Sequence, residues 1–137
     1  MEYLIDTCVL IDHLTGRLAA KVSNWLEKII LSGAAVSSVI VYHELLTGAR
    51  TPKAQKIVKT LLENWELIPV DSTIAEFAAT LRREWAAEGK TMSMADSLIA
   101  ATAAIKGVKV ITSNLKDFPP SLTLSLEKAI QISAPEI

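Results

Sequence analysis

The sequence predicts an α/β domain with a central, mostly parallel sheet of four to five strands and helices on both faces. Short apolar runs of strand length alternate with longer segments whose apolar residues recur at helical spacing. This alternation is typical of right-handed β-α-β crossovers, which place parallel strands side by side. The chain of 137 residues corresponds to a single domain, residues 1–137, which is large enough to bury its own core.

In the first half of the chain, three predicted strands are separated by helices. An apolar run ends on Asp6, and a short helix follows it as far as Asp12. Apolar residues at helical spacing continue from Leu18 until Gly33 stops that helix. A strand at 34–37 comes next, followed by a helix at 39–47 that ends at Gly48. Another helix begins at Pro52, and its predicted core face is Ile57, Leu61, Leu62 and Trp65. A strand at 66–70 completes this half.

The second half continues the alternation of helix and strand. Its first helix is capped by Asp71 or Ser72 and ends at Gly89. Its second helix is capped by Ser93 and runs to Ile105, before Gly107. A strand follows at 108–112, and Pro119-Pro120 then breaks the chain. The tail that follows is ambiguous between a strand and a short helix.

Composition excludes several classes of protein. Half of the residues are hydrophobic and the mean hydropathy is +0.34, so we expect part of the apolar surface to pair with a subunit or partner. No apolar run has the ~20 residues of a membrane span, and we expect a cytoplasmic protein. Cys8 is the single cysteine, which excludes an internal disulfide. The net charge of −1 provides no general basic field for nucleic acid.

Four acids are spread along the chain, each after an apolar run that is predicted to be a strand or to lie near one. They are Asp6, Glu44, Asp96 and Asp117. Ligands of open parallel sheets collect beyond the carboxyl ends of the strands, so distant residues can meet there. Four converging carboxylates repel one another, and a bound divalent cation resolves that conflict. The pattern therefore favours a metal-dependent phosphodiesterase of the nuclease kind.

Each acid also has an ordinary structural interpretation. Asp6 and Asp117 stand where they can cap turns or helices, and Asp96 follows Ser93 at the spacing of a capping box. Glu44 could be an exposed helix residue. Against this, Glu44 lies among apolar neighbours, where a lone buried carboxylate is costly without a cation or partner. The eight residues after Asp96 carry no charge.

Four segments of the chain carry a resemblance to PIN-domain ribonucleases, in the order in which that family has them. They are residues 3–12 (YLIDTCVLID), 37–48 (SSVIVYHELLTG), 94–103 (MADSLIAATA) and 112–118 (TSNLKDF). The resemblance covers about residues 2–120. In size and organisation the chain is most similar to the VapC toxins of bacterial and archaeal toxin–antitoxin pairs.

The resemblance implies a metal-dependent endoribonuclease that acts as a toxin. Asp6, Glu44, Asp96 and Asp117 would then form an acidic quartet that holds Mg²⁺ or Mn²⁺, with Thr7, Thr112 and Asn114 hydrogen-bonding the acids, water or phosphate. The family also implies an RNA substrate, a cognate antitoxin protein and a homodimer. Because Asp117 follows the strand at 108–112 by several residues, Asn114 could stand nearer the metal.

Two other functions remain open. A phosphatase-like enzyme could use Asp6 as a nucleophile, but such enzymes usually carry a second acid two residues later, where this chain has Cys8. A noncatalytic member of the fold could only bind a partner, although it would have no use for an anionic cluster.

The remaining polar residues are expected to be structural. We expect Cys8 to be a core residue and both histidines, His13 and His43, to lie outside the catalytic set. Lys53, Lys56 and Lys59 recur along one helix and form either a solvated face or a contact for RNA phosphates.

Overall fold

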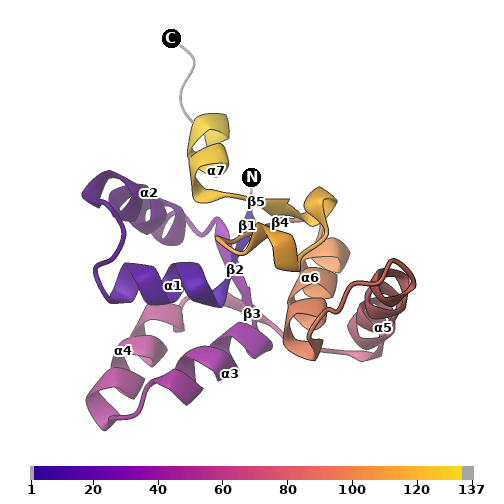
Figure 1. Ribbon diagram of the computed structural model, residues 1–137. Helices are drawn as coiled ribbons and strands as arrows, with labels where there is room; N and C mark the ends of the chain where they lie inside the picture. Colours follow the sequence, from indigo (N-terminus) through magenta and orange to yellow (C-terminus); the bar gives the residue numbers. More distant parts are fainter. Residues whose placement is uncertain (1, 134–137) are drawn as a thin grey trace.

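In the computed structural model, which describes residues 2–133, a five-stranded sheet forms the centre of the molecule (Figure 1). Its strand order is β3-β2-β1-β4-β5, and every neighbouring pair is parallel. The strands are β1 (Tyr3–Ile5), β2 (Ala35–Ser38), β3 (Glu66–Ile68), β4 (Lys109–Ile111) and β5 (Thr123–Leu124). The predicted fold class is therefore confirmed.

The middle strand, β1, is buried along its whole length because sheet neighbours and helices surround it. Leu4 pairs with Val36 of β2 on one side and with Val110 of β4 on the other. None of these three apolar side chains is more than 1% exposed. Continuous apolar runs of this kind suit a parallel strand that is covered on both faces.

Seven α-helices and two short 3₁₀ helices connect and flank the described strands. They are α1 (Thr7–Leu14), α2 (Ala20–Leu31), α3 (Val39–Gly48), α4 (Pro52–Leu62), α5 (Ser72–Ala87), α6 (Met94–Lys106), η1 (Leu115–Asp117), η2 (Pro120–Leu122) and α7 (Leu126–Ser133). In the view of Figure 1, α1 to α4 lie to the left of and below the strands, whereas α5 and α6 lie to the right.

The connections explain this division of the helices between the two faces. The chain moves outward from β1 through β2 to β3 and then returns through α5 and α6 to β4, which lies on the other side of β1. Because right-handed crossovers in opposite directions place their helices on opposite faces, the helices cover both sides of the sheet. The strand order reverses between β1 and β4, where ligand sites of such sheets form.

Side-chain caps begin most of the helices that border the carboxyl ends of the strands. Asp6 caps α1, Ser38 caps α3, Asp71 rather than Ser72 caps α5, and Ser93 caps α6. At the other end of α6, Gly107 adopts φ +78°, a left-handed conformation that glycine adopts without steric cost.

The structure corrects several details of the sequence prediction. Helix α1 continues past Asp12 to Leu14, and α2 begins after Leu18. Of the predicted core face of α4, Leu62 and Trp65 are buried and Leu61 is half-buried, but Ile57 is 47% exposed, and Val58 is buried instead. The ambiguous tail contains both kinds of element, β5 and α7.

Among the described residues, no helix combines the length and the apolar character that crossing a membrane requires.

Candidate functional site

The predicted site residues gather at the carboxyl ends of β1 and β4, where the strand order reverses. Asp6 directly follows β1, and its backbone N–H donates to the carbonyl of Ile111 in β4 at 2.9 Å. Thr112 directly follows β4. Two residues that are 106 positions apart are thus held together by the pairing of their strands.

Asp6 is only 5% exposed, and its carboxylate accepts three hydrogen bonds. The Thr112 hydroxyl donates to Oδ2 at 2.8 Å, and the backbone N–H of Thr7 donates to Oδ1 at 2.9 Å. The thiol of Cys8 donates to Oδ2 at 3.4 Å. Because these donors replace water, the anion is tolerated at a depth where a bare carboxylate would be costly.

Glu44 joins the site from α3. It is half-buried, and its Oε1 accepts the hydroxyl of Thr7 at 2.7 Å. Thr7 therefore contacts two acids at once, Asp6 through its backbone N–H and Glu44 through its side chain. The hydrogen bond links α1 to α3, two helices that pack against each other.

Asp96 lies in the first turn of α6 and is half-buried. Burial raises the pKa of its carboxyl group, a hydrogen bond with the Ser93 side chain opposes that shift, and the charges of Asp6, Asp117 and Glu44 raise the pKa further. All four predicted acids are thus close enough to interact electrostatically around Asp96.

Asp117 and Asn114 take part in different ways. Asp117 is half-buried at the end of η1, and its charge acts on Asp96. Asn114 acts through its backbone, whose N–H donates to the Thr112 hydroxyl at 3.0 Å, while its side chain is exposed. The hydroxyl of Thr112 is thereby oriented so that its own proton points to Asp6.

The acids are grouped but are not drawn into a coordination shell. Within residues 2–133, no set of three or more His, Cys, Asp or Glu side chains is already arranged to hold a metal ion. Their chemistry nevertheless fits a hard divalent cation, which prefers oxygen ligands. Mg²⁺ commonly uses one or two carboxylates directly and fills its other positions with water or phosphate.

Sequence reasoning missed a contact between Cys8 and Ser113. Cys8, which we expected in the core, packs half-buried against it and also lies beside Asp6, and its sulfur accepts the Ser113 hydroxyl at 3.1 Å. The two residues are 105 positions apart, so no local pattern could reveal the contact. Of the histidines, His13 hydrogen-bonds Ser23 on α2 at 2.7 Å, and His43 is exposed.

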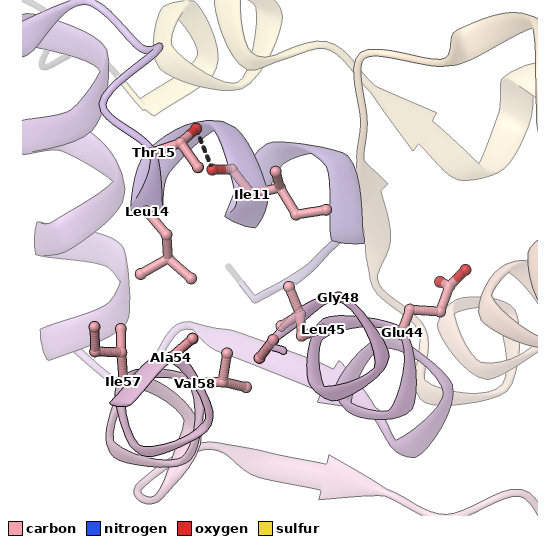
Figure 2. Close-up of a pocket in the computed structure, with 10 residues that line it drawn as sticks. Ile11, Leu14, Thr15, Glu44, Leu45, Gly48, Ala54, Ile57 and Val58 are labelled. Carbon is pink, nitrogen blue, oxygen red and sulfur yellow. Dashed lines mark hydrogen bonds between the residues drawn. The ribbon is translucent and has the colours of Figure 1, made fainter. Parts of the chain in front are cut away.

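An apolar pocket of about 300 Å³ lies between α1, α3 and α4 and has Glu44 among its lining residues (Figure 2). Leu14 and Ile57 point toward each other across it, and Glu44 lies at its edge with the carboxylate turned away from the apolar lining. A neighbouring pocket continues past Leu14 and Ile57 to Lys53 and Lys56. Glu44 thus borders one end of this apolar surface, and Lys53 and Lys56 border the other.

Comparison with known proteins identifies the family. Residues 3–119 match the model of the PIN domain. The chain is 33% identical over 116 residues to ribonuclease VapC10 of Mycobacterium tuberculosis, covering 85% of each chain. It is also 33% identical over 118 residues to ribonuclease VapC19 of the same species, covering 85% of this chain and 91% of the relative.

A solved structure shares the same fold. VapBC2 of Rickettsia felis, bound to a DNA fragment from its promoter, superposes with a TM-score of 0.74 at 22% identity and covers 91% of this chain and 98% of the matched one. The PIN-domain model spans most of the chain, and the VapC ribonucleases align over 85% and 91% of their own length. This chain therefore belongs to the PIN-domain family as a member of the VapC type.

Proposed function

We propose that this protein is a metal-dependent endoribonuclease, the toxin of a type II toxin–antitoxin system, and that Asp6, Glu44, Asp96 and Asp117 hold Mg²⁺ or Mn²⁺. The observation that carries the proposal is the convergence of four acids at the strand reversal of a PIN fold. The names of its relatives, ribonucleases VapC10 and VapC19, support the choice of RNA as substrate.

When bound, the cation lowers the pKa of a coordinated water and offsets negative charge on the scissile phosphate. The chain's own residues prepare for that ion. Thr112 and the backbone of Thr7 hold the Asp6 carboxylate in one orientation, and the Thr7 hydroxyl fixes one oxygen of Glu44. Each of these acids has a second oxygen or lone pair left for a cation or for a water molecule.

The net reaction adds water across one P–O bond of the RNA backbone. In the metal-free protein the pKa of the half-buried Asp96 carboxyl group is raised, so binding of the cation would displace any proton held there. Because the net charge is −1, local groups such as Lys53 and Lys56, both exposed on α4, are the candidates to contact phosphates.

The decisive experiment is cleavage of RNA by the purified chain with Mg²⁺ or Mn²⁺ and with a chelator. We expect cleavage only with the metal and none by Asp96→Asn. The matched control is Asp12→Asn, which makes the same chemical change at a half-buried aspartate on α1 that faces Arg17 at 4.0 Å. Intact RNA with wild-type protein and metal would favour a noncatalytic partner-binding protein instead.

We also infer an antitoxin partner that covers the apolar pocket between α1, α3 and α4. Its support is the pocket itself, together with structural relatives described as toxin–antitoxin complexes. Self-association into a homodimer is the second inference, because other large apolar side chains are exposed, including Leu31 (87%) and Met94 (64%). Sedimentation at micromolar concentration tests it, and a strict monomer would rule it out.

A further inference from the structure

We propose that Cys8 and Ser113 are positioning residues, which orient the Asp6 carboxylate so that one of its oxygens is presented to the cation. The role rests on the proposed metal-dependent function. On this proposal the two side chains contact neither RNA nor the metal and act through Asp6.

The two oxygens of Asp6 have different surroundings. Oδ2 accepts two side-chain hydrogen bonds, from the Thr112 hydroxyl at 2.8 Å and from the Cys8 thiol at 3.4 Å. Oδ1 accepts the backbone N–H of Thr7 at 2.9 Å. Since a carboxylate oxygen offers about two lone-pair positions, Oδ2 is fully used by the protein and Oδ1 keeps one position for a cation.

Cys8 is itself oriented by the loop that follows β4. The Ser113 hydroxyl donates to the Cys8 sulfur at 3.1 Å, so the sulfur is the acceptor in that contact and its S–H remains available for Asp6. The sulfur also lies 3.7 Å from the Thr112 hydroxyl. The contacts therefore run from Ser113, in the loop after β4, to Cys8 in α1, and from Cys8 to Asp6 at the end of β1.

A thiol suits this position because it is a weak donor. It fixes the direction of Oδ2 without neutralising the carboxylate as strongly as a cationic side chain would. The negative charge that attracts the metal is kept, while rotation of the side chain is restricted. Groups that hydrogen-bond metal ligands in this way typically change metal affinity when they are removed.

The test is titration of Mn²⁺ into the metal-free protein without RNA, following unbound Mn²⁺ by electron paramagnetic resonance. Cys8→Ala and Cys8→Ser form a matched pair, because both remove the sulfur but only serine keeps a donor. We expect Cys8→Ala to weaken Mn²⁺ binding about 10-fold and Cys8→Ser to stay within about twofold of the wild type. In cleavage assays the Cys8→Ala defect should shrink as Mn²⁺ is raised, with KM for RNA unchanged.

Ser113→Ala provides a second variant, at an exposed residue where the fold is not at risk. We expect binding about threefold weaker than wild type, and no additional loss when it is combined with Cys8→Ala, since Ser113 acts through the thiol. Additive losses in the double variant would contradict the proposal that Ser113 acts through Cys8.

The outcomes separate this inference from the function on which it rests. If the wild-type chain does not bind Mn²⁺, both are wrong. If the wild type binds Mn²⁺ and folded Cys8→Ala binds it equally well, the positioning role alone is wrong. If Cys8→Ala does not fold, as judged by circular dichroism, wild-type affinity in Ser113→Ala overturns the role instead.

Discussion

Asp96 carries an electrostatic cost in the metal-free protein. Its pKa is raised above the ordinary value of 3.8, first by burial and then, against the opposing Ser93 hydrogen bond, by the charges of Asp6, Asp117 and Glu44. The folded state therefore holds this proton more tightly than the unfolded chain does. The contribution of Asp96 to the free energy of unfolding therefore falls as the pH rises from 3.8 to the higher pKa of the folded state. Above that pKa the contribution remains low.

Asp96→Asn should remove that dependence. We expect the metal-free variant to be more stable than wild type near neutral pH and to lose the advantage as the pH falls below 3.8, where Asp96 becomes protonated in both states. Thermal denaturation in chelator across this range measures the difference. A stability difference that does not change with pH would contradict the assignment of the raised pKa to Asp96.

Asp6→Asn should change the free energy of unfolding in the opposite direction from Asp96→Asn. Its carboxylate accepts donors on both oxygens, whereas an asparagine amide turns an N–H toward either the Thr112 hydroxyl and Cys8 or the backbone of Thr7. We expect Asp6→Asn to lower the free energy of unfolding by about 1–3 kcal/mol, despite the removal of a like charge. Urea denaturation in chelator measures this, and a variant as stable as Asp96→Asn would show that repulsion dominates at Asp6 too.

At the scale of the element, the start of α6 serves the helix and the site together. The Ser93 hydroxyl accepts the backbone N–H of Asp96 at 3.0 Å and so caps the helix that carries this acid. Removing the cap should therefore affect stability much more than metal binding.

Ser93→Ala should cost about 1 kcal/mol of unfolding free energy while leaving Mn²⁺ affinity nearly unchanged. Thr51→Ala is the matched control, since the Thr51 hydroxyl caps α4 by accepting the N–H of Ala54 at 3.1 Å. Urea denaturation and Mn²⁺ titration of both variants test the separation. If only Ser93→Ala weakened Mn²⁺ binding, Ser93 would have a role at the site beyond its cap.

The elements that the sequence predicts well are those with strong local signals. Caps and glycines delimit α5 and α6, and the apolar run of β1 marks the buried centre of the sheet. Where local signals are weak, prediction fails: β5 has only two residues, and α4 carries apolar residues at both Ile57 and Val58. Both residues line the pocket, but Val58 is only 5% exposed, whereas Ile57 is 47% exposed, a difference that depends on how the neighbouring helices pack.

The same limit applies to the candidate site. The four acids were identifiable because each follows a recognisable strand or opens a recognisable helix in a family motif. The contacts that hold Asp6 could not all be derived, because Cys8 and Ser113 meet only after β1 has paired with β4. Long-range pairing of this kind is a property of the assembled sheet.

At the scale of the whole molecule, the pocket between α1, α3 and α4 offers a test of partner binding. Ile57→Glu places a charge on the apolar surface and should weaken antitoxin binding at least 10-fold, as loss of a central apolar contact does. Ile57 is 47% exposed, so the fold and Mn²⁺ affinity should be retained. Calorimetric titration with the antitoxin measures the change.

Ile105→Glu is the matched control, because Ile105 is also 47% exposed but lies on α6, away from the pocket. We expect it to bind the antitoxin like wild type. Equal losses in the two variants would mean that the partner does not use the pocket specifically.

The pairing of β1 with β4 also sets the moment during synthesis at which the candidate site is completed. A nascent chain that has left the ribosome only as far as α6 already contains Asp6, Glu44 and Asp96, but it lacks β4, Thr112 and Asp117. Asp6 then has no Ile111 carbonyl to fix its backbone and no Thr112 hydroxyl to hold its carboxylate. On the proposed function, we therefore expect an incomplete chain to be inactive toward RNA, and activity to begin only when the last strands of the sheet emerge.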